Sequence, residues 1–77
     1  MREYEQTISI LEKMSGIKID DPDMSLQNNL GLDSLEMVLL LVEIEDSFDI
    51  EIKESDMNPF DLKTVSDVVM LVERYTK

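Results

Sequence analysis

The sequence predicts an all-α fold: a small antiparallel bundle of three main helices and one short helix, with a long first loop. Apolar residues recur at three- and four-residue steps in three separate stretches. Helix-capping residues precede two of these stretches, and Gly or Pro lies in the segments between them. Because the chain has only 77 residues, we expect one domain over residues 1–77 with a thin hydrophobic core.

The first helix is predicted over residues 3–15, and Gly16 follows at the position where helices usually end. Its apolar stripe consists of Tyr4, Ile8, Ile10, Leu11 and Met14. Residues 16–33 then form a long connection with the polar run 27–29. A loop of this length is unusual in so small a domain. Its six scattered apolar residues favour a loop pinned over the core: Ile17, Ile19, Met24, Leu26, Leu30 and Leu32.

The second helix begins at Asp33, a good N-cap that forms a capping box with Glu36, and runs to about Ser47. At about 100° per residue it carries two apolar rows. We place the longer row inside: Met37, Leu40, Leu41, Ile44 and Phe48. The second row then lies at or near solvent and consists of Leu35, Val38, Leu39 and Val42. Its acidic border is formed by Glu36, Glu43, Glu45 and Asp46.

Residues 48–63 divide into shorter pieces, in which Ile50 and Ile52 point inward. Ser55 and Asp56 are able to cap one short turn before Pro59. Thr64 caps the last helix, with Asp67 in the matching position of a capping box. The buried stripe of this helix is predicted to consist of Val65, Val68, Val69, Val72 and Tyr75.

The charge balance argues against nucleic-acid binding and for basic partner surfaces, since 18 acidic and 7 basic residues give a net charge of −11. Ten acidic residues and no Lys or Arg lie between Ile19 and Ile52. The second row of the central helix is therefore predicted to be a docking surface for a partner that is apolar at its centre and basic at its rim. Alternatively, this row packs under the 16–33 loop.

Several chemistries are excluded by composition. Without Cys or His there is no thiol nucleophile, disulfide, zinc finger or imidazole base. The segment from Asp21 lacks the Gly and Glu of a calcium-binding loop, so only loose binding of divalent ions is expected. The longest apolar run, Met37–Val42, is too short for a membrane span. We therefore expect a free-standing cytoplasmic protein. We expect no enzymatic activity, since so small a domain has little room for a pocket.

The segment Leu30–Leu35 reads Leu-Gly-Leu-Asp-Ser-Leu and resembles the attachment motif of the acyl carrier protein family. The stretch 43–50 and the pair Thr64-Val65 are also similar to that family. The resemblance implies that Ser34 carries a covalent 4′-phosphopantetheine arm, next to Asp33 and Leu35, which holds acyl groups as thioesters. It implies as partners a phosphopantetheinyl transferase and acyl-loading, condensing and modifying enzymes. The partner surface would comprise Leu35, Glu36, Val38, Leu39, Val42, Glu45 and Asp46, on a monomer without membrane insertion.

The local physics suits this role, because free N–H groups at a helix start favour a phosphodiester. Gly31 would permit a close backbone approach just before the cap, and Asp33 would help the transferase arrange its metal ion. Without the resemblance, Ser34 would read as an ordinary first-turn serine. Shelter for the acyl group is predicted between the helices, a space that is equally well explained as plain core. Its predicted lining is Leu40, Ile44, Ile52, Val65 and Val69, and Met37 and Met57 would adapt to a cargo if they line the same space.

Two residues depart from the pattern of fatty-acid carriers, in which Glu is common at the position of Leu39 and an acidic residue at that of Asn29. Both changes remove negative charge near Ser34. These departures leave room for a specialised pathway with its own partners, whereas the rest of the motif favours the housekeeping fatty-acid cycle. The resemblance thus implies a cargo of fatty-acid or related lipid or polyketide synthesis. The alternatives are a peptidyl or aminoacyl carrier of a specialised pathway, and a cofactor-free acidic helical adaptor.

Overall fold

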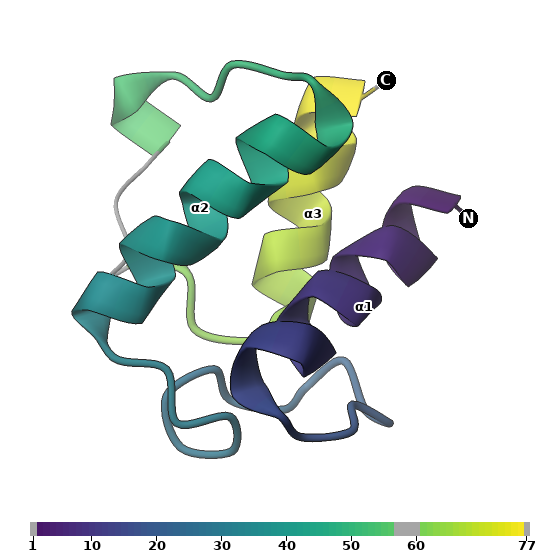
Figure 1. The fold of residues 1–77 in the computed structure, drawn as a ribbon, viewed down its shortest axis with the longest axis vertical. Coiled ribbons are helices and arrows are strands. Elements are labelled where there is room, and N and C mark those ends of the chain that lie inside the picture. Colours follow the sequence, from purple (N-terminus) through teal and green to yellow (C-terminus); the bar gives the residue numbers. More distant parts are fainter. Residues whose placement is uncertain (1, 57–60, 77) are drawn as a thin grey trace.

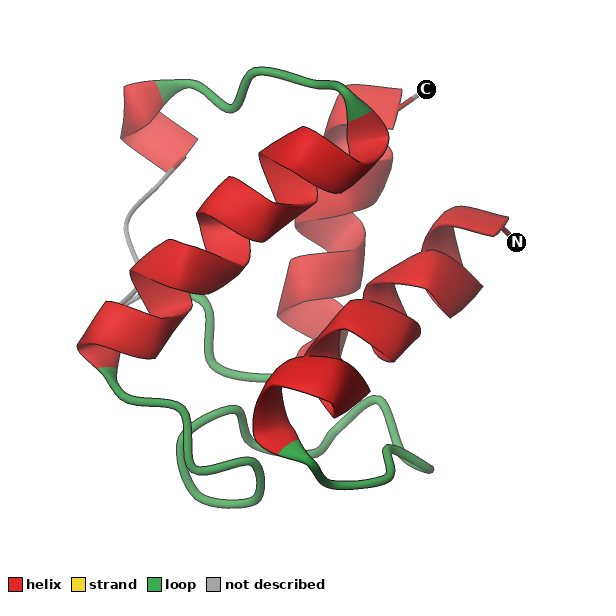
Figure 2. Ribbon diagram, in the orientation of Figure 1, coloured by secondary structure: helices red, strands yellow, loops and turns green. Residues whose placement is uncertain are grey.

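The computed structural model describes residues 2–56 and 61–76. It contains the helices α1 (Arg2–Ser15), α2 (Ser34–Phe48) and α3 (Val65–Thr76), together with the short 3-10 helix η1 (Glu54–Asp56). Figure 2 shows that helices and loops make up the whole of this described part, without a strand. The predicted all-α class with three main helices and one short one is confirmed.

The three helices pack around one core, with α1 in contact with both α2 and α3. In Figure 1, α1 runs downward while α2 and α3 run upward, so α1 is antiparallel to both. The loop after α1 passes beneath the bundle and leads to the start of α2. Both chain ends lie on the far side of the molecule from the start of α2.

The core contains the longer row of α2, as predicted. Leu40, Leu41 and Ile44 are completely buried, Met37 is 5 % exposed, and Phe48 is half-buried against the core. α1 contributes Ile10 and Leu11. The buried residues of α3 are Val65, Val68, Val69, Leu71 and Val72.

The predicted stripe of α1 is wrong at its first position. Tyr4 is 39 % exposed, whereas Thr7 is completely buried. The Thr7 hydroxyl donates a hydrogen bond to the Glu3 carbonyl at 2.6 Å, which satisfies the polar group inside the core. A search for apolar residues alone passes over a threonine that is satisfied in this way.

The long first loop is pinned over the core, as its apolar residues predicted. Leu26, Leu30 and Leu32 are each at most 3 % exposed, although Ile17 remains 39 % exposed. The Glu12 carboxylate accepts a hydrogen bond from the Ile19 N–H at 2.8 Å. This bond ties the beginning of the loop to α1.

An isolated antiparallel bridge between Ser25 and Thr64 joins the loop to the start of α3. The Leu26 N–H donates to the Lys63 carbonyl at 2.9 Å, and the Val65 N–H donates to the Met24 carbonyl at 3.1 Å. The predicted capping box of α3 is also present. In it, the Thr64 N–H donates to Asp67 Oδ2 at 3.1 Å, and the Asp67 N–H donates to Thr64 Oγ1 at 3.3 Å.

The segment around η1 is held against the end of α3 by side chains. The Tyr75 hydroxyl donates to Asp56 Oδ2 and accepts from the Lys53 N–H at 3.0 Å. Arg74 Nη1 lies 3.2 Å from Asp56 Oδ1. The hydrogen bond to the Asp56 carboxylate raises the pKa of Tyr75, because that bond is lost when the phenol ionises.

None of the helices found in residues 2–56 and 61–76 is both long enough and apolar enough to cross a membrane.

Candidate functional site

The start of α2 is fixed by the predicted capping box. Asp33 has an extended backbone (φ −87°, ψ −178°), and its Oδ1 accepts a hydrogen bond from the Glu36 N–H at 2.8 Å. The Glu36 carboxylate in turn accepts from the Asp33 N–H at 3.4 Å. An N-cap of this kind typically stabilises a helix by about 1 kcal/mol. It makes Ser34 the first residue of α2, where its side chain is exposed.

Gly31 serves this site through its backbone conformation and not, as predicted, by allowing a close approach. Its φ is +68°, a region that disfavours residues with a Cβ. A Cβ at this position would meet no atom within 4 Å. The residues on either side, Leu30 and Leu32, are anchored in the core at 3 % exposure. The chain therefore turns between two anchors just before the cap.

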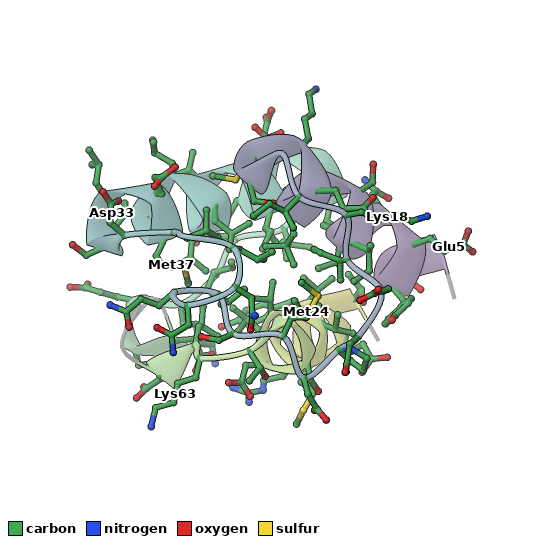
Figure 3. All side chains as sticks on the ribbon, turned by 90° about the horizontal axis from the view of Figure 1, so that it is seen from below. Glu5, Lys18, Met24, Asp33, Met37 and Lys63 are labelled. Carbon is green, nitrogen blue, oxygen red and sulfur yellow. The ribbon has the colours of Figure 1, made fainter. Side chains whose placement is uncertain are left out.

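A pocket of about 410 Å³ opens beside Ser34, between the first loop, the start of α2 and the segment before α3. Figure 3 shows Asp33 and Met37 on one side of this end of the molecule and Lys63 on the other. We call it the loop pocket. Its polar lining residues are Ser25, Gln27, Asn28, Asp33, Ser34 and Lys63, and its apolar ones are Leu26, Leu32, Met37 and Leu62.

The space between the helices that was predicted as an acyl shelter is filled by packed side chains, and Met37 alone of its predicted lining also borders the loop pocket. Five of the others are at most 8 % exposed members of the packed core: Leu40, Ile44, Ile52, Val65 and Val69. Met57 lies outside the described residues. Helical periodicity shows which side chains point inward, but it does not show whether space remains between them.

The sequence analysis missed four residues that line the pocket beside Ser34: Ser25, Gln27, Asn28 and Lys63. The available signal was the polar run 27–29, close to the motif. Asn29 has a structural task in this loop, because its Oδ1 accepts a hydrogen bond from the Ser25 N–H at 2.7 Å. The Asn29 side chain thus shapes the loop, at a position where fatty-acid carriers commonly have an acidic residue.

The second apolar row of α2 lies on the surface. Leu35 is 67 % exposed, and Val38, Leu39 and Val42 are 44 %, 52 % and 51 % exposed. These fractions rule out the alternative that the row packs under the first loop. The four side chains form a ridge that leads away from Ser34 along α2.

The four acidic residues that border this ridge differ in their exposure and in their hydrogen bonds. Glu43 and Asp46 are exposed. Glu36 and Glu45 are half-buried, and their carboxylates accept hydrogen bonds from backbone N–H groups. Glu36 does so in the capping box, and Glu45 accepts from the Ile52 N–H at 2.8 Å. Among the described residues, no group of three or more Asp, Glu, His or Cys is arranged to hold a metal ion.

Comparison with known proteins places this site in a family. Residues 5–72 match the sequence profile described as "Phosphopantetheine attachment site". An acyl carrier protein of Desulforapulum autotrophicum is 37 % identical over 67 residues, which are 84 % of each chain. A D-alanyl carrier protein of Lactococcus lactis subsp. cremoris is 35 % identical over 74 residues, 94 % of each chain.

The crystal structure of an acyl carrier protein from Thermotoga maritima has the same fold, with a TM-score of 0.72 at 20 % identity. The superposition covers 94 % of this chain and 88 % of that one. The chain belongs to the acyl carrier protein family, whose members carry 4′-phosphopantetheine covalently on a serine. The site fits that group, because an exposed serine hydroxyl lies next to a pocket with both amide and apolar walls.

Proposed function

We propose that Ser34 is the attachment residue and that residues 1–77 form one non-catalytic carrier domain. The observation that carries this proposal is the exposed Ser34 side chain at the first position of α2, beside the loop pocket. With coenzyme A as the donor, the Ser34 oxygen loses its proton and forms a phosphodiester to the arm, while the pyrophosphate bond of coenzyme A breaks and 3′,5′-ADP leaves. The free N–H groups of the helix start favour the negative charge of the phosphodiester. The arm supplies the thiol that holds acyl groups as thioesters, which this Cys-free chain lacks.

The surface beside Ser34 is proposed to receive the partner enzymes: a phosphopantetheinyl transferase and acyl-loading, condensing and modifying enzymes. The exposed ridge of Leu35, Val38, Leu39 and Val42 supplies apolar contact. Glu36, Glu45 and Asp46 add negative charge at its border, which suits basic partner surfaces. Asp33 holds Ser34 in place for the transferase and helps that enzyme to arrange its metal ion.

For the cargo, we propose an acyl group of fatty-acid, lipid or polyketide synthesis. An aminoacyl cargo is the second candidate, because the D-alanyl carrier protein of L. lactis aligns over 94 % of this chain. The exposed Leu39 also favours partners other than those of fatty-acid carriers, where Glu is common at this position. Both candidates use the same attachment to Ser34.

The test is to incubate the apo-protein with coenzyme A and a phosphopantetheinyl transferase and to measure its intact mass. We expect the wild type to gain the mass of one phosphopantetheine and Ser34→Ala to gain none. Ser9→Ala is the matched control, since Ser9 is an exposed helical serine on α1, and it should be loaded like the wild type. If several transferases all fail to load the folded wild type, the cofactor-free adaptor becomes the better explanation.

A further inference from the structure

The loop pocket has two amide side chains at its wall with free hydrogen-bonding capacity. Gln27 and Asn28 line the pocket and are exposed. Neither side chain forms a hydrogen bond to any residue within 2–56 or 61–76. Each amide group offers both a donor and an acceptor. The pocket wall is therefore able to pair with another amide.

The backbone that carries these two amides is held firmly. The Asn28 N–H donates to Ser25 Oγ at 3.0 Å, and the Asn29 N–H donates to the Ser25 carbonyl at 3.0 Å. The bond from the Leu26 N–H to Lys63, at 2.9 Å, fixes this turn against the segment before α3. A wall held in this way loses less entropy when it binds a ligand.

The ligand within reach is the arm that starts at Ser34. Phosphopantetheine contains two amide groups, separated by short aliphatic segments. These features match the polar wall of the pocket and its apolar floor of Leu26, Leu32, Met37 and Leu62. The volume of about 410 Å³ lies near the lower end of the roughly 300–1,000 Å³ common for small-molecule pockets. It suits part of the arm, but not the arm together with a long alkyl chain.

We propose that the loop pocket binds the amide-bearing part of the arm, with Gln27 and Asn28 as positioning residues. This proposal rests on the attachment of the arm to Ser34. The arm would then lie against the carrier's own surface at this pocket. The core beneath the pocket is packed in this structure, since Leu40, Leu41 and Ile44 are completely buried.

The first test compares backbone amide chemical shifts of ¹⁵N-labelled apo- and holo-protein, after intact mass has shown complete loading. We expect loading to shift residues 25–28 and 62–63 in addition to residues 33–35. Shifts confined to residues 33–35 would overturn the pocket proposal while leaving the attachment to Ser34 intact. Failure to load the protein at all would instead contradict the proposed function.

The second test measures how fast the thiol of the arm reacts with a thiol reagent, relative to free pantetheine. We expect the holo wild type to react more slowly than free pantetheine. The double variant Gln27→Ala, Asn28→Ala should react at least about threefold faster than the wild type, because each lost hydrogen bond weakens docking.

Gln6→Ala is the control, since it removes an exposed amide of α1 outside the pocket lining. Gln6 Nε2 donates a hydrogen bond to the Ser47 carbonyl at 3.3 Å, so this control also shows what the loss of a surface hydrogen bond alone does. The thiol of the arm attached to this control variant should react at the wild-type rate. Equal thiol reactivity of the double variant and the wild type would show that the two amides do not position the arm. Melting curves identify any variant that is misfolded, and the wild-type shift comparison needs no variant.

Discussion

Tyr75 couples the end of α3 to the segment around η1 through one hydroxyl group, which donates to Asp56 and accepts from the Lys53 N–H. Its raised pKa means that the folded protein holds the phenolic proton more tightly than the unfolded chain does. The stability contributed in this way is fully present below pH 10.0, the ordinary pKa, and is lost as the pH rises through the higher pKa of the folded state.

We predict that Tyr75 titrates above its ordinary value of 10.0 in the folded protein. Because the chain has only two tyrosines, Tyr4→Phe leaves Tyr75 as the sole phenol, and its ionisation can be followed by ultraviolet absorbance. Asp56→Asn in the same background should lower the pKa of Tyr75 towards 10.0, since the carboxylate acceptor is removed. An unchanged titration in that double variant would show that Asp56 is not the cause.

At the same scale, the residues next to Ser34 were predictable because their signals are local. Asp33 and Glu36 are three residues apart, and the capping box that they predict is present. The reason for Gly31 was not predictable, because a sequence does not distinguish a positive φ from a close approach. The burial of Thr7 was also missed, because a sequence does not show that its hydroxyl is satisfied by a hydrogen bond to the Glu3 carbonyl of its own helix.

Among the elements, α2 is unusual in having two apolar rows with different environments. One row is buried in the core, and the other is 44–67 % exposed. A surface ridge of four large apolar side chains, next to Ser34, is costly to expose to water and typical of an interaction site. One row of α2 thus packs in the core, and the other is available for the partner binding that we propose.

We predict that substitutions in the two rows have opposite consequences. Leu41→Ala should destabilise the fold by about 2–5 kcal/mol, because Leu41 is completely buried. Leu39→Gln should change the free energy of unfolding by less than about 0.5 kcal/mol, because Leu39 is a surface residue. It should nevertheless weaken binding to a partner enzyme by about tenfold or more, because the ridge loses an apolar contact and gains no charge.

Urea denaturation measures the stability of both variants, and titration with the phosphopantetheinyl transferase measures binding. A loss of stability in Leu39→Gln comparable to that in Leu41→Ala would mean that the outer row packs within the protein. Unchanged transferase binding by a well-folded Leu39→Gln would place that enzyme on another surface.

The helices were predictable from sequence because periodicity and capping act over a few residues. The loop pocket was not predictable, because its walls depend on contacts between distant parts of the chain. The hydrogen bond between Leu26 and Lys63 joins residues that lie on opposite sides of α2 in the sequence. No local pattern in residues 25–28 indicates that they will face the segment before α3.

Over the whole molecule, the distribution of charge opposes folding as well as guiding partners. The net charge is −11, and ten acidic residues without a basic one lie between Ile19 and Ile52. Their mutual repulsion near neutral pH destabilises the compact state. The described residues provide no group of three or more side chains arranged to hold a metal ion, so relief by cations should be diffuse.

We predict that Mg²⁺ and Ca²⁺ both raise the melting temperature, and by similar amounts, because residues 2–56 and 61–76 contain no group of three or more Asp or Glu side chains arranged to hold either ion. Thermal denaturation followed by circular dichroism measures this effect. KCl at the same ionic strength is the control for simple screening, which acts over about 10 Å at 0.1 M salt. Equal melting temperatures in KCl and in the divalent salts would contradict the prediction, and a strong preference for one divalent ion would indicate a specific site.

The two ends of the chain lie away from the start of α2, on the opposite side of the bundle (Figure 1). A linker, fluorophore or affinity tag joined at either end would thus extend away from Ser34. The molecule can be immobilised on a sensor chip through its amino or carboxyl end with the start of α2 turned towards the solution. Enzymes flowing over such a chip would meet the serine and the ridge beside it without obstruction.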